Sequence, residues 1–175
     1  MTPASPLDDE IVALAVQSGR ALLAAGLKVV TAESCTGGGV AAALTDVAGS
    51  SQWFERGYVT YSNAAKIQDL GIERALIERH GAVSAEVAAQ MSAGALRASG
   101  AHIAVAVTGI AGPEGGTAGK PVGQVFFAVL RRNGAVHVLR EQFPGDRSSV
   151  RRAAVAVALR LIMQAAAAAN FDTNR

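Results

Sequence analysis

The stretch TAESCTGGGV, residues 31–40, decides the fold and raises the question of function. The apolar pair Val29-Val30 leads into it as a buried strand, and alanines and valines at helical spacing follow it. Between them stand a serine, the only cysteine of the chain, a threonine and three consecutive glycines. In open α/β sheets, ligands bind beyond the carboxyl ends of the strands, where loops pass into helices. The stretch therefore predicts an α/β protein, in which this turn either binds a ligand or only packs a helix closely on a strand, with an N-cap from Ser34 or Thr36.

The remainder of the chain predicts alternating helices and strands from its apolar periodicity. Helices are expected over residues 6–26, 36–49, 63–70, 72–81 and 84–100. Strands are expected over residues 27–34, 56–62 and 102–109. The dipeptide Asn133-Gly134 is a hairpin turn between strands over residues 124–132 and 135–143.

The final helix is expected to start near Asp146 and to present one apolar face, made of Val150, Ala153, Ala154, Val157 and Leu161. With the elements before it, this helix predicts a three-layer α/β/α sandwich. Its mixed sheet of about five strands should be mostly parallel, with one antiparallel strand contributed by the hairpin.

Length and composition fit a single compact domain over residues 1–175, because single cores usually span about 100–200 residues. Half of the residues are hydrophobic but only 5% are aromatic, so the core should pack closely on small side chains. The net charge of +2 gives no reason to expect nucleic-acid binding. One cysteine, an acidic N-terminal stretch and no apolar run of about 20 residues predict a cytoplasmic protein without disulfide, signal peptide or membrane span.

Four motifs occur in a fixed order along the chain: TAESCTGG, GSSQWFERGYVTYSNAAK, GAVS and TGIAGPEGG followed by KPVGQV. Together they resemble the C-terminal domain of the CinA family over residues 8–162. The resemblance implies an α/β/α sandwich that hydrolyses the carboxamide of nicotinamide mononucleotide to nicotinate mononucleotide and ammonia. Longer family members carry a molybdopterin-binding-like domain that this sequence lacks, so a free-standing form is expected.

Two other functions stay open at this point. The same fold could hold a nucleotide without turnover, as a sensor or competence-related module. It could also be an amidase for another substrate. The serines, the tyrosine and the lysine that amide hydrolysis would use are present, which favours an enzyme.

A metal-independent mechanism without a cofactor is expected. His80, His102 and His137 are scattered, and no pair of ligand types has the spacing of a zinc site. A Ser-His-Asp triad lacks an obvious histidine for the same reason. A serine nucleophile with a lysine base, a known variant of the triad, is the remaining arrangement.

Only three lysines can supply the base. Lys28 precedes the first strand, at the wrong end of the sheet, and Lys120 lies in a glycine-rich loop. Lys66 follows the second strand by one helical turn, and Tyr61 closes that strand. The segment Y-S-N-x-x-K matches the family, and the resemblance implies Lys66 as the base and Tyr61 as a proton relay. A lysine base needs partial burial, which lowers its pKa.

Two serines match the family pattern, Ser34 and Ser51, and the sequence favours Ser51 as the nucleophile. Ser34 opens a helix, where N-capping competes for its hydroxyl, whereas Ser51 has no such task. However, Ser51 and Lys66 flank a strand of five or six residues, which parts its ends by about 15–20 Å. Ser51 can reach Lys66 only if a loop folds back or a second subunit supplies it, and otherwise Ser34 takes the role. Cys35 ranks third, as a thiol whose pKa a helix N-terminus would lower.

The resemblance also implies a substrate site. Thr108 and the backbone of Gly109 and Ile110 correspond to the part that holds the nicotinamide end, and Gly37 and Gly38 to its other wall. A small molecule, nicotinamide mononucleotide, is therefore the expected partner. The valines and phenylalanines of the hairpin offer an interface for a homodimer.

Positive charge is concentrated near the C-terminus, where residues 131–175 hold three acids and eight arginines: 131, 132, 140, 147, 151, 152, 160 and 175. A solvated helix face explains most of them, although the excess could attract an anion. Asp146 is the expected N-cap of the last helix, and Arg147 in its first turn is the expected clamp for the 5′-phosphate, with Arg151 or Arg152 as substitutes.

Overall fold

Helices and strands alternate along the chain before a hairpin and a long last helix. The computed structural model describes residues 6–167. Its helices are α1 (Pro6–Ala25), α2 (Gly39–Thr45), the short 3₁₀ helix η1 (Ser50–Gln52), α3 (Asn63–Leu70), α4 (Arg74–His80), α5 (Ala85–Arg97) and α6 (Arg147–Ala167). Its strands are β1 (Val29–Glu33), β2 (Phe54–Val59), β3 (Ile103–Gly109), β4 (Gln124–Arg131) and β5 (Val136–Gln142).

The five strands form one sheet in the order β2-β1-β3-β4-β5. Strand β1 pairs in parallel with β2 and β3, whereas β4 is antiparallel to both β3 and β5. Only β4 therefore runs against the other strands of this sheet, which confirms the prediction of one antiparallel strand from the hairpin. The carboxyl ends of β1, β2 and β3 meet at one edge of the sheet, called here the carboxyl edge, and their first residues lie at the opposite, amino edge.

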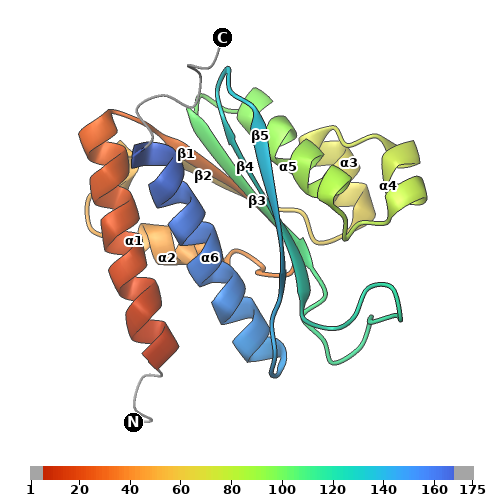
Figure 1. Ribbon diagram of the computed structural model, residues 1–175. Coiled ribbons are helices and arrows are strands. Elements are labelled where there is room, and N and C mark those ends of the chain that lie inside the picture. The colour runs from red at the N-terminus through yellow and green to blue at the C-terminus, as the bar shows by residue number, and fades with distance from the viewer. Residues whose placement is uncertain (1–5, 168–175) are drawn as a thin grey trace.

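Helices cover both faces of the sheet, as the predicted sandwich requires (Figure 1). Helices α1, α2 and α6 lie on one face, and α3, α4 and α5 lie on the other. Alternate residues of β3 serve the two layers: Ile103, Val105 and Val107 pack towards α6, whereas Ala104 and Ala106 face α5. The small alanines allow α5 to lie close to the sheet.

Helix α5 also approaches the end of α3 very closely, at Gly94. A Cβ atom there would lie 2.1 Å from the backbone oxygen of Leu70, so only glycine fits. Helix starts follow the expected chemistry: Ser84 accepts a hydrogen bond from the Val87 N–H, and Asp146 accepts one from the Ser149 N–H.

The apolar face of α6 is broader than the sequence predicts. Val150 and Ala154 are buried as expected, but Ala153, Val157 and Leu161 are only half-buried. The other buried positions are Val155, Ala156, Ala158, Leu159, Ile162, Ala165 and Ala166. The reason is that α6 packs between the sheet on one side and α1 on the other, so two sides of the helix are covered.

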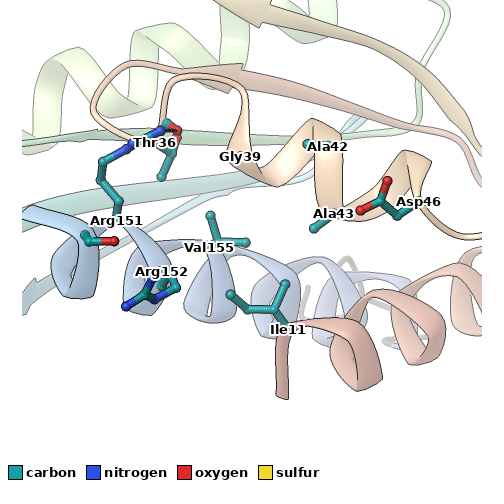
Figure 2. A pocket seen from close by; sticks show the side chains of 10 residues that line it. Ile11, Thr36, Gly39, Ala42, Ala43, Asp46, Arg151, Arg152 and Val155 are labelled. Atoms are coloured by element: carbon teal, nitrogen blue, oxygen red, sulfur yellow. Dashed lines mark hydrogen bonds between the residues drawn. The ribbon is translucent and has the colours of Figure 1, made fainter. Parts of the chain in front are cut away.

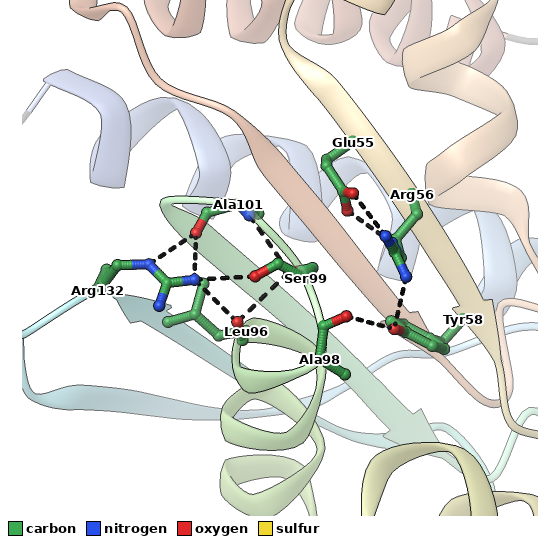
Figure 3. A network of polar contacts seen from close by, with 8 residues as sticks. All are labelled: Glu55, Arg56, Tyr58, Leu96, Ala98, Ser99, Ala101 and Arg132. Atoms are coloured by element: carbon green, nitrogen blue, oxygen red, sulfur yellow. Dashed lines mark hydrogen bonds and ion pairs between the residues drawn. The ribbon is translucent and has the colours of Figure 1, made fainter.

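A polar network fastens the C-terminal end of α5 (Figure 3). The Arg132 guanidinium donates to the carbonyl oxygens of Leu96 at 2.9 Å and Ala101 at 2.8 Å. From β2, the Tyr58 hydroxyl donates to the Ala98 oxygen at 3.3 Å. Arginine satisfies helix carbonyls that have no partner within the helix. Arg132 thus holds the C-terminal end of α5 in place.

None of the helices in the described part of the chain has the length and apolar character needed to cross a membrane.

Candidate functional site

A cavity of about 270 Å³ lies at the carboxyl edge of the sheet. Five segments of the chain line it: the turn after β1, the loop and helix after β2, the segment between α4 and α5, the loop after β3 and the first turn of α6. The side chains that line it and carry chemistry are those of Ser34, Cys35, Tyr61, Lys66, Thr108 and Arg147. The cavity lies where the sequence predicts the functional site, and most of the proposed residues meet there.

Lys66 is buried in this cavity, with only 1% of its surface exposed. Its Nζ donates to Ser34 Oγ at 2.9 Å and to the Thr60 carbonyl oxygen at 2.7 Å. Burial disfavours the charged ammonium and lowers the pKa of Lys66 from 10.5 to about 8. At such a pKa a sizeable share of the amine is neutral in mildly alkaline solution. Lys66 can therefore take a proton from the Ser34 hydroxyl.

The Ser34 hydroxyl is available because another residue caps α2. Glu33, the last residue of β1, is fully buried, and its carboxylate accepts hydrogen bonds from the Val40 N–H at 3.0 Å and the Ala41 N–H at 2.8 Å. The residue in the N-cap position, Gly38, has a left-handed φ of 89° and offers no side chain. The competition for the Ser34 hydroxyl that the sequence suggested is thus absent. The signal for Glu33 was an acid ending an apolar strand just before a glycine-rich turn.

Ser51 does not line this cavity. It is exposed in η1, just before β2 begins, whereas Lys66 follows the end of β2. Strand β2 separates the two residues and Ser51 does not line the cavity, so within one chain the structure does not bring Ser51 to Lys66. Ser34 occupies the position beside the lysine instead.

Cys35 lines the cavity but has the wrong electrostatics for a nucleophile. Burial raises the pKa of its thiol from 9.0 to about 11, although Lys66 and Arg151 act in the opposite direction. The expected depression by a helix N-terminus does not prevail, because desolvation of the thiolate is the largest influence. The thiol stays protonated and behaves as a small buried side chain.

Tyr61 and Arg147 meet at the mouth of the cavity. Tyr61 lies beyond the end of β2 rather than closing it, and 57% of its surface is exposed. Its hydroxyl accepts a hydrogen bond from Arg147 Nη2 at 2.6 Å, and Arg147 Nη1 donates to the Gly112 carbonyl oxygen at 3.0 Å. Arg147 therefore bridges the segment after β2 and the loop after β3.

The proposed substrate walls are only partly as expected. Thr108 is fully buried, donates from Oγ1 to the Ala82 oxygen at 2.8 Å, and lines the cavity together with Gly109 and Ile110. Gly37 and Gly38 face elsewhere: a Cβ on Gly37 would lie 3.3 Å from Arg151 Nη2, and one on Gly38 would lie 3.4 Å from Val59. The wall near the turn is made by Ser34 and Cys35, because the glycines allow the backbone to turn behind them.

The described part of the chain, residues 6–167, contains no group of three or more histidine, cysteine, aspartate or glutamate residues arranged to hold a metal ion.

Comparison with known proteins places this geometry in a family. The model of the CinA C-terminal domain matches residues 11–166. The chain belongs to the CinA C-terminal domain family. Nicotinamide-nucleotide amidohydrolase PncC of Escherichia coli (strain K12) is 53% identical over 157 residues, which are 90% of this chain and 95% of that protein. The protein of the same name from Pseudomonas putida is 52% identical over 156 residues, which are 89% of this chain and 97% of its own.

Solved structures of CinA-family proteins share the fold. The competence/damage inducible protein CihA from Agrobacterium tumefaciens superposes with a TM-score of 0.87 at 45% identity, covering 94% of this chain and 97% of that chain. The competence damage-inducible protein A from Klebsiella pneumoniae gives 0.87 at 40% identity, covering 91% and 99%. The CinA-family match spans every residue that lines the cavity at the carboxyl edge.

Proposed function

We propose that this CinA-family chain hydrolyses the carboxamide of nicotinamide mononucleotide to nicotinate mononucleotide and ammonia. The observation that carries the proposal is the buried pair of Lys66 and Ser34, whose Nζ and Oγ atoms lie 2.9 Å apart in a cavity open to a ligand. The names of relatives more than 50% identical to this chain support the choice of substrate.

The pair supplies a complete acyl-transfer cycle. Neutral Lys66 accepts the Ser34 proton while Oγ attacks the carboxamide carbon, which gives a tetrahedral intermediate with a negative oxygen. The intermediate collapses as the Lys66 ammonium returns the proton to the leaving nitrogen, and ammonia departs. Water then attacks the Ser34 ester with Lys66 again as the base, which releases the nicotinate product and restores the serine.

The cavity volume suggests how a nucleotide would be divided between cavity and mouth. Small-molecule sites usually have volumes of about 300–1,000 Å³. The cavity of about 270 Å³ suits the nicotinamide ring better than a whole mononucleotide. We therefore propose that Thr108, Gly109 and Ile110 hold the ring, and that the 5′-phosphate lies at the mouth near Arg147.

Tyr61 keeps its proposed role as a proton relay at the mouth. Its hydroxyl accepts a hydrogen bond from Arg147, and both residues line the cavity. The Lys66 ammonium is held independently by Ser34 and Thr60. In this proposal Tyr61 relays protons between Lys66 and the leaving nitrogen or the attacking water, and Lys66 remains the base in both steps.

The test is ammonia release by purified protein from nicotinamide mononucleotide, compared with NAD and free nicotinamide. We expect release from the mononucleotide and little from the other two, and we expect activity to survive exhaustive EDTA treatment. Saturable binding of the mononucleotide without ammonia release would replace the proposal with a nucleotide-binding module. Faster ammonia release from another carboxamide would show that nicotinamide mononucleotide is not the preferred substrate.

A further inference from the structure

The turn of residues 34–38 separates two cavities. Ser34 and Cys35 line the candidate active site, whereas Thr36 and Gly39 line a second cavity of about 290 Å³ between α2 and α6. Arg151 of α6 also lines this second cavity (Figure 2). A residue outside the active site therefore contacts the back of the turn that carries the proposed nucleophile.

Arg151 grips the backbone of this turn with two hydrogen bonds. Its Nε donates to the Cys35 carbonyl oxygen at 3.2 Å, and its Nη2 donates to the Thr36 carbonyl oxygen at 2.8 Å. The next residue, Arg152, behaves differently. Figure 2 shows Arg151 extending to the turn at Thr36, while Arg152 points away from it, and Arg152 Nε lies 3.7 Å from the Asp8 carboxylate.

The hydrogen bond to Cys35 fixes the direction of the next N–H group. In a trans peptide the C=O and N–H bonds point to opposite sides. Because the Cys35 carbonyl faces Arg151, the Thr36 N–H points away from Arg151, towards the side on which Ser34 and Cys35 line the active site. A guanidinium bound to the carbonyl also polarises the peptide, which strengthens the N–H as a donor.

Several neighbouring N–H groups of the turn are already engaged, whereas those of Cys35, Thr36 and Gly38 donate to no backbone oxygen in the described residues. The Gly37 N–H donates to the Ser34 oxygen at 3.0 Å, and the Gly39 N–H donates to the Thr36 oxygen at 3.2 Å. The N–H groups of Val40 and Ala41 bind Glu33. The Thr36 N–H, two residues after Ser34, is thus well placed to meet a negative oxygen that forms beside Ser34.

We propose that Arg151 is a positioning residue: it holds the Cys35–Thr36 peptide so that the Thr36 N–H donates to the oxyanion formed when Ser34 attacks the carboxamide. This inference rests on the proposed serine mechanism. Backbone donors aimed at the developing oxyanion are strong catalytic groups, and removing one costs about 100- to 1,000-fold in kcat. Loosening a donor without removing it costs less.

The test compares Arg151→Met and Arg151→Lys with the matched control Arg152→Met, because the adjacent arginine pairs with Asp8 and does not line the candidate active site. We expect Arg151→Met to lower kcat for nicotinamide mononucleotide by about 10- to 100-fold with KM changed less than about threefold. Arg151→Lys, which keeps a charge and a donor, should recover part of the loss. Arg152→Met should keep the wild-type kcat.

A thioamide analogue, with sulfur in place of the carboxamide oxygen, separates oxyanion binding from general loosening. Sulfur is a poor hydrogen-bond acceptor, so the Arg151 variants should lose much less on the thioamide than on the amide. Equal losses on both substrates in a folded Arg151 variant, or a wild-type kcat, would overturn the inference. Circular dichroism of each variant establishes whether it is folded. If Arg151→Met does not fold, Arg151→Lys is used for the same comparison.

Labelling by a fluorophosphonate probe keeps the inference testable even if the substrate is wrong. The probe modifies an activated serine, and its phosphoryl oxygen occupies the oxyanion position. Wild-type protein that is labelled at Ser34 but releases no ammonia would contradict the proposed function alone. Slower labelling of the Arg151 variants, with Arg152→Met unchanged, would still support the positioning role, and equal labelling rates would contradict it.

Discussion

The two edges of the sheet are built from the same strands but differ in what they bury. The amino edge is closed by apolar packing, with Trp53 buried against Gly19. The carboxyl edge instead buries polar and charged side chains, namely Glu33, Ser34, Thr36, Thr60, Lys66, Thr108 and Gln124. Burial of polar groups costs free energy unless they find hydrogen-bond partners. A cluster of buried polar and ionisable groups therefore marks the carboxyl edge as the candidate functional edge of the sheet.

Within the carboxyl edge, two fully buried charged residues illustrate different solutions. Glu33 satisfies its carboxylate with two backbone N–H groups, and its role is to hold α2 and the turn. Lys66 finds only a hydroxyl and a carbonyl, and its pKa is lowered to about 8. Glu33, whose carboxylate is held by backbone N–H groups, therefore has a structural role. The ammonium of Lys66 has no nearby negative partner among its hydrogen bonds, so it loses its proton more easily.

The largest expected effect is a loss of activity that depends on which edge of the sheet carries the substitution. Ser34→Ala should lower kcat by about a thousand-fold or more, because it removes the atom that attacks the substrate. Ser51→Ala, at the amino edge, should change kcat by less than about twofold. Steady-state ammonia release measures both variants. Loss of activity in Ser51→Ala, restored by mixing it with Ser34→Ala protein, would instead indicate a site shared between subunits.

The second prediction separates the edges by stability. Trp53→Ala should lower the free energy of unfolding by about 3–5 kcal/mol, since it leaves a large cavity at the amino edge. Its kcat per folded molecule should stay near the wild-type value. Urea unfolding gives the folded fraction, and active-site titration then gives the rate per active molecule. A large fall in kcat for fully folded protein would show that the edges are coupled.

The third prediction concerns pH. The pKa of Lys66 is about 8 in the folded protein, against the ordinary lysine value of 10.5 in an unfolded chain. Between these values the unfolded chain binds more protons, so this group makes stability rise with pH, and below pH 8 the folded state bears the full cost of a buried ammonium. Lys66→Met should therefore be stabilised near pH 7 by on the order of 3 kcal/mol.

The measurement is the free energy of urea unfolding of wild type and Lys66→Met from pH 7 to pH 10. The difference between the two proteins should shrink as pH rises. A constant difference would show that the pKa of Lys66 is not lowered. Wild-type kcat/KM should rise with pH through a midpoint near 8, where the neutral amine forms. Lys66→Met should show no such activity.

The smallest effect concerns the mouth of the carboxyl edge. Arg147→Ala should weaken capture of nicotinamide mononucleotide by about 10- to 100-fold, the usual value of a charge-assisted contact to a phosphate. Nicotinamide riboside, which has no phosphate, should lose less. Some loss on both is expected because Arg147 also holds Tyr61 and Gly112. Comparing kcat/KM on both substrates tests this, and equal losses would assign Arg147 to structure alone.

Much of the fold was predictable from the sequence because its signals are local. The periodicity of residues 63–70 gave the bounds of α3, and Ser84 and Asp146 begin their helices through contacts within three residues. Asn133-Gly134 produced the hairpin and its single antiparallel strand. The end of β2 was misplaced because Tyr61 and Ser62 continue the strand pattern after pairing with β1 has stopped.

The candidate site was predictable only in part. The sequence by itself determined which residue types stand at the carboxyl ends of the strands, and the family resemblance then selected Lys66, Ser34 and Thr108 among them as candidates. It did not determine which serine meets the lysine, that Glu33 caps α2, or that Arg151 grips the turn from 115 or more positions away. Those choices depend on contacts between segments distant in the chain, and only folding sets the distances and burial that give each side chain its chemistry.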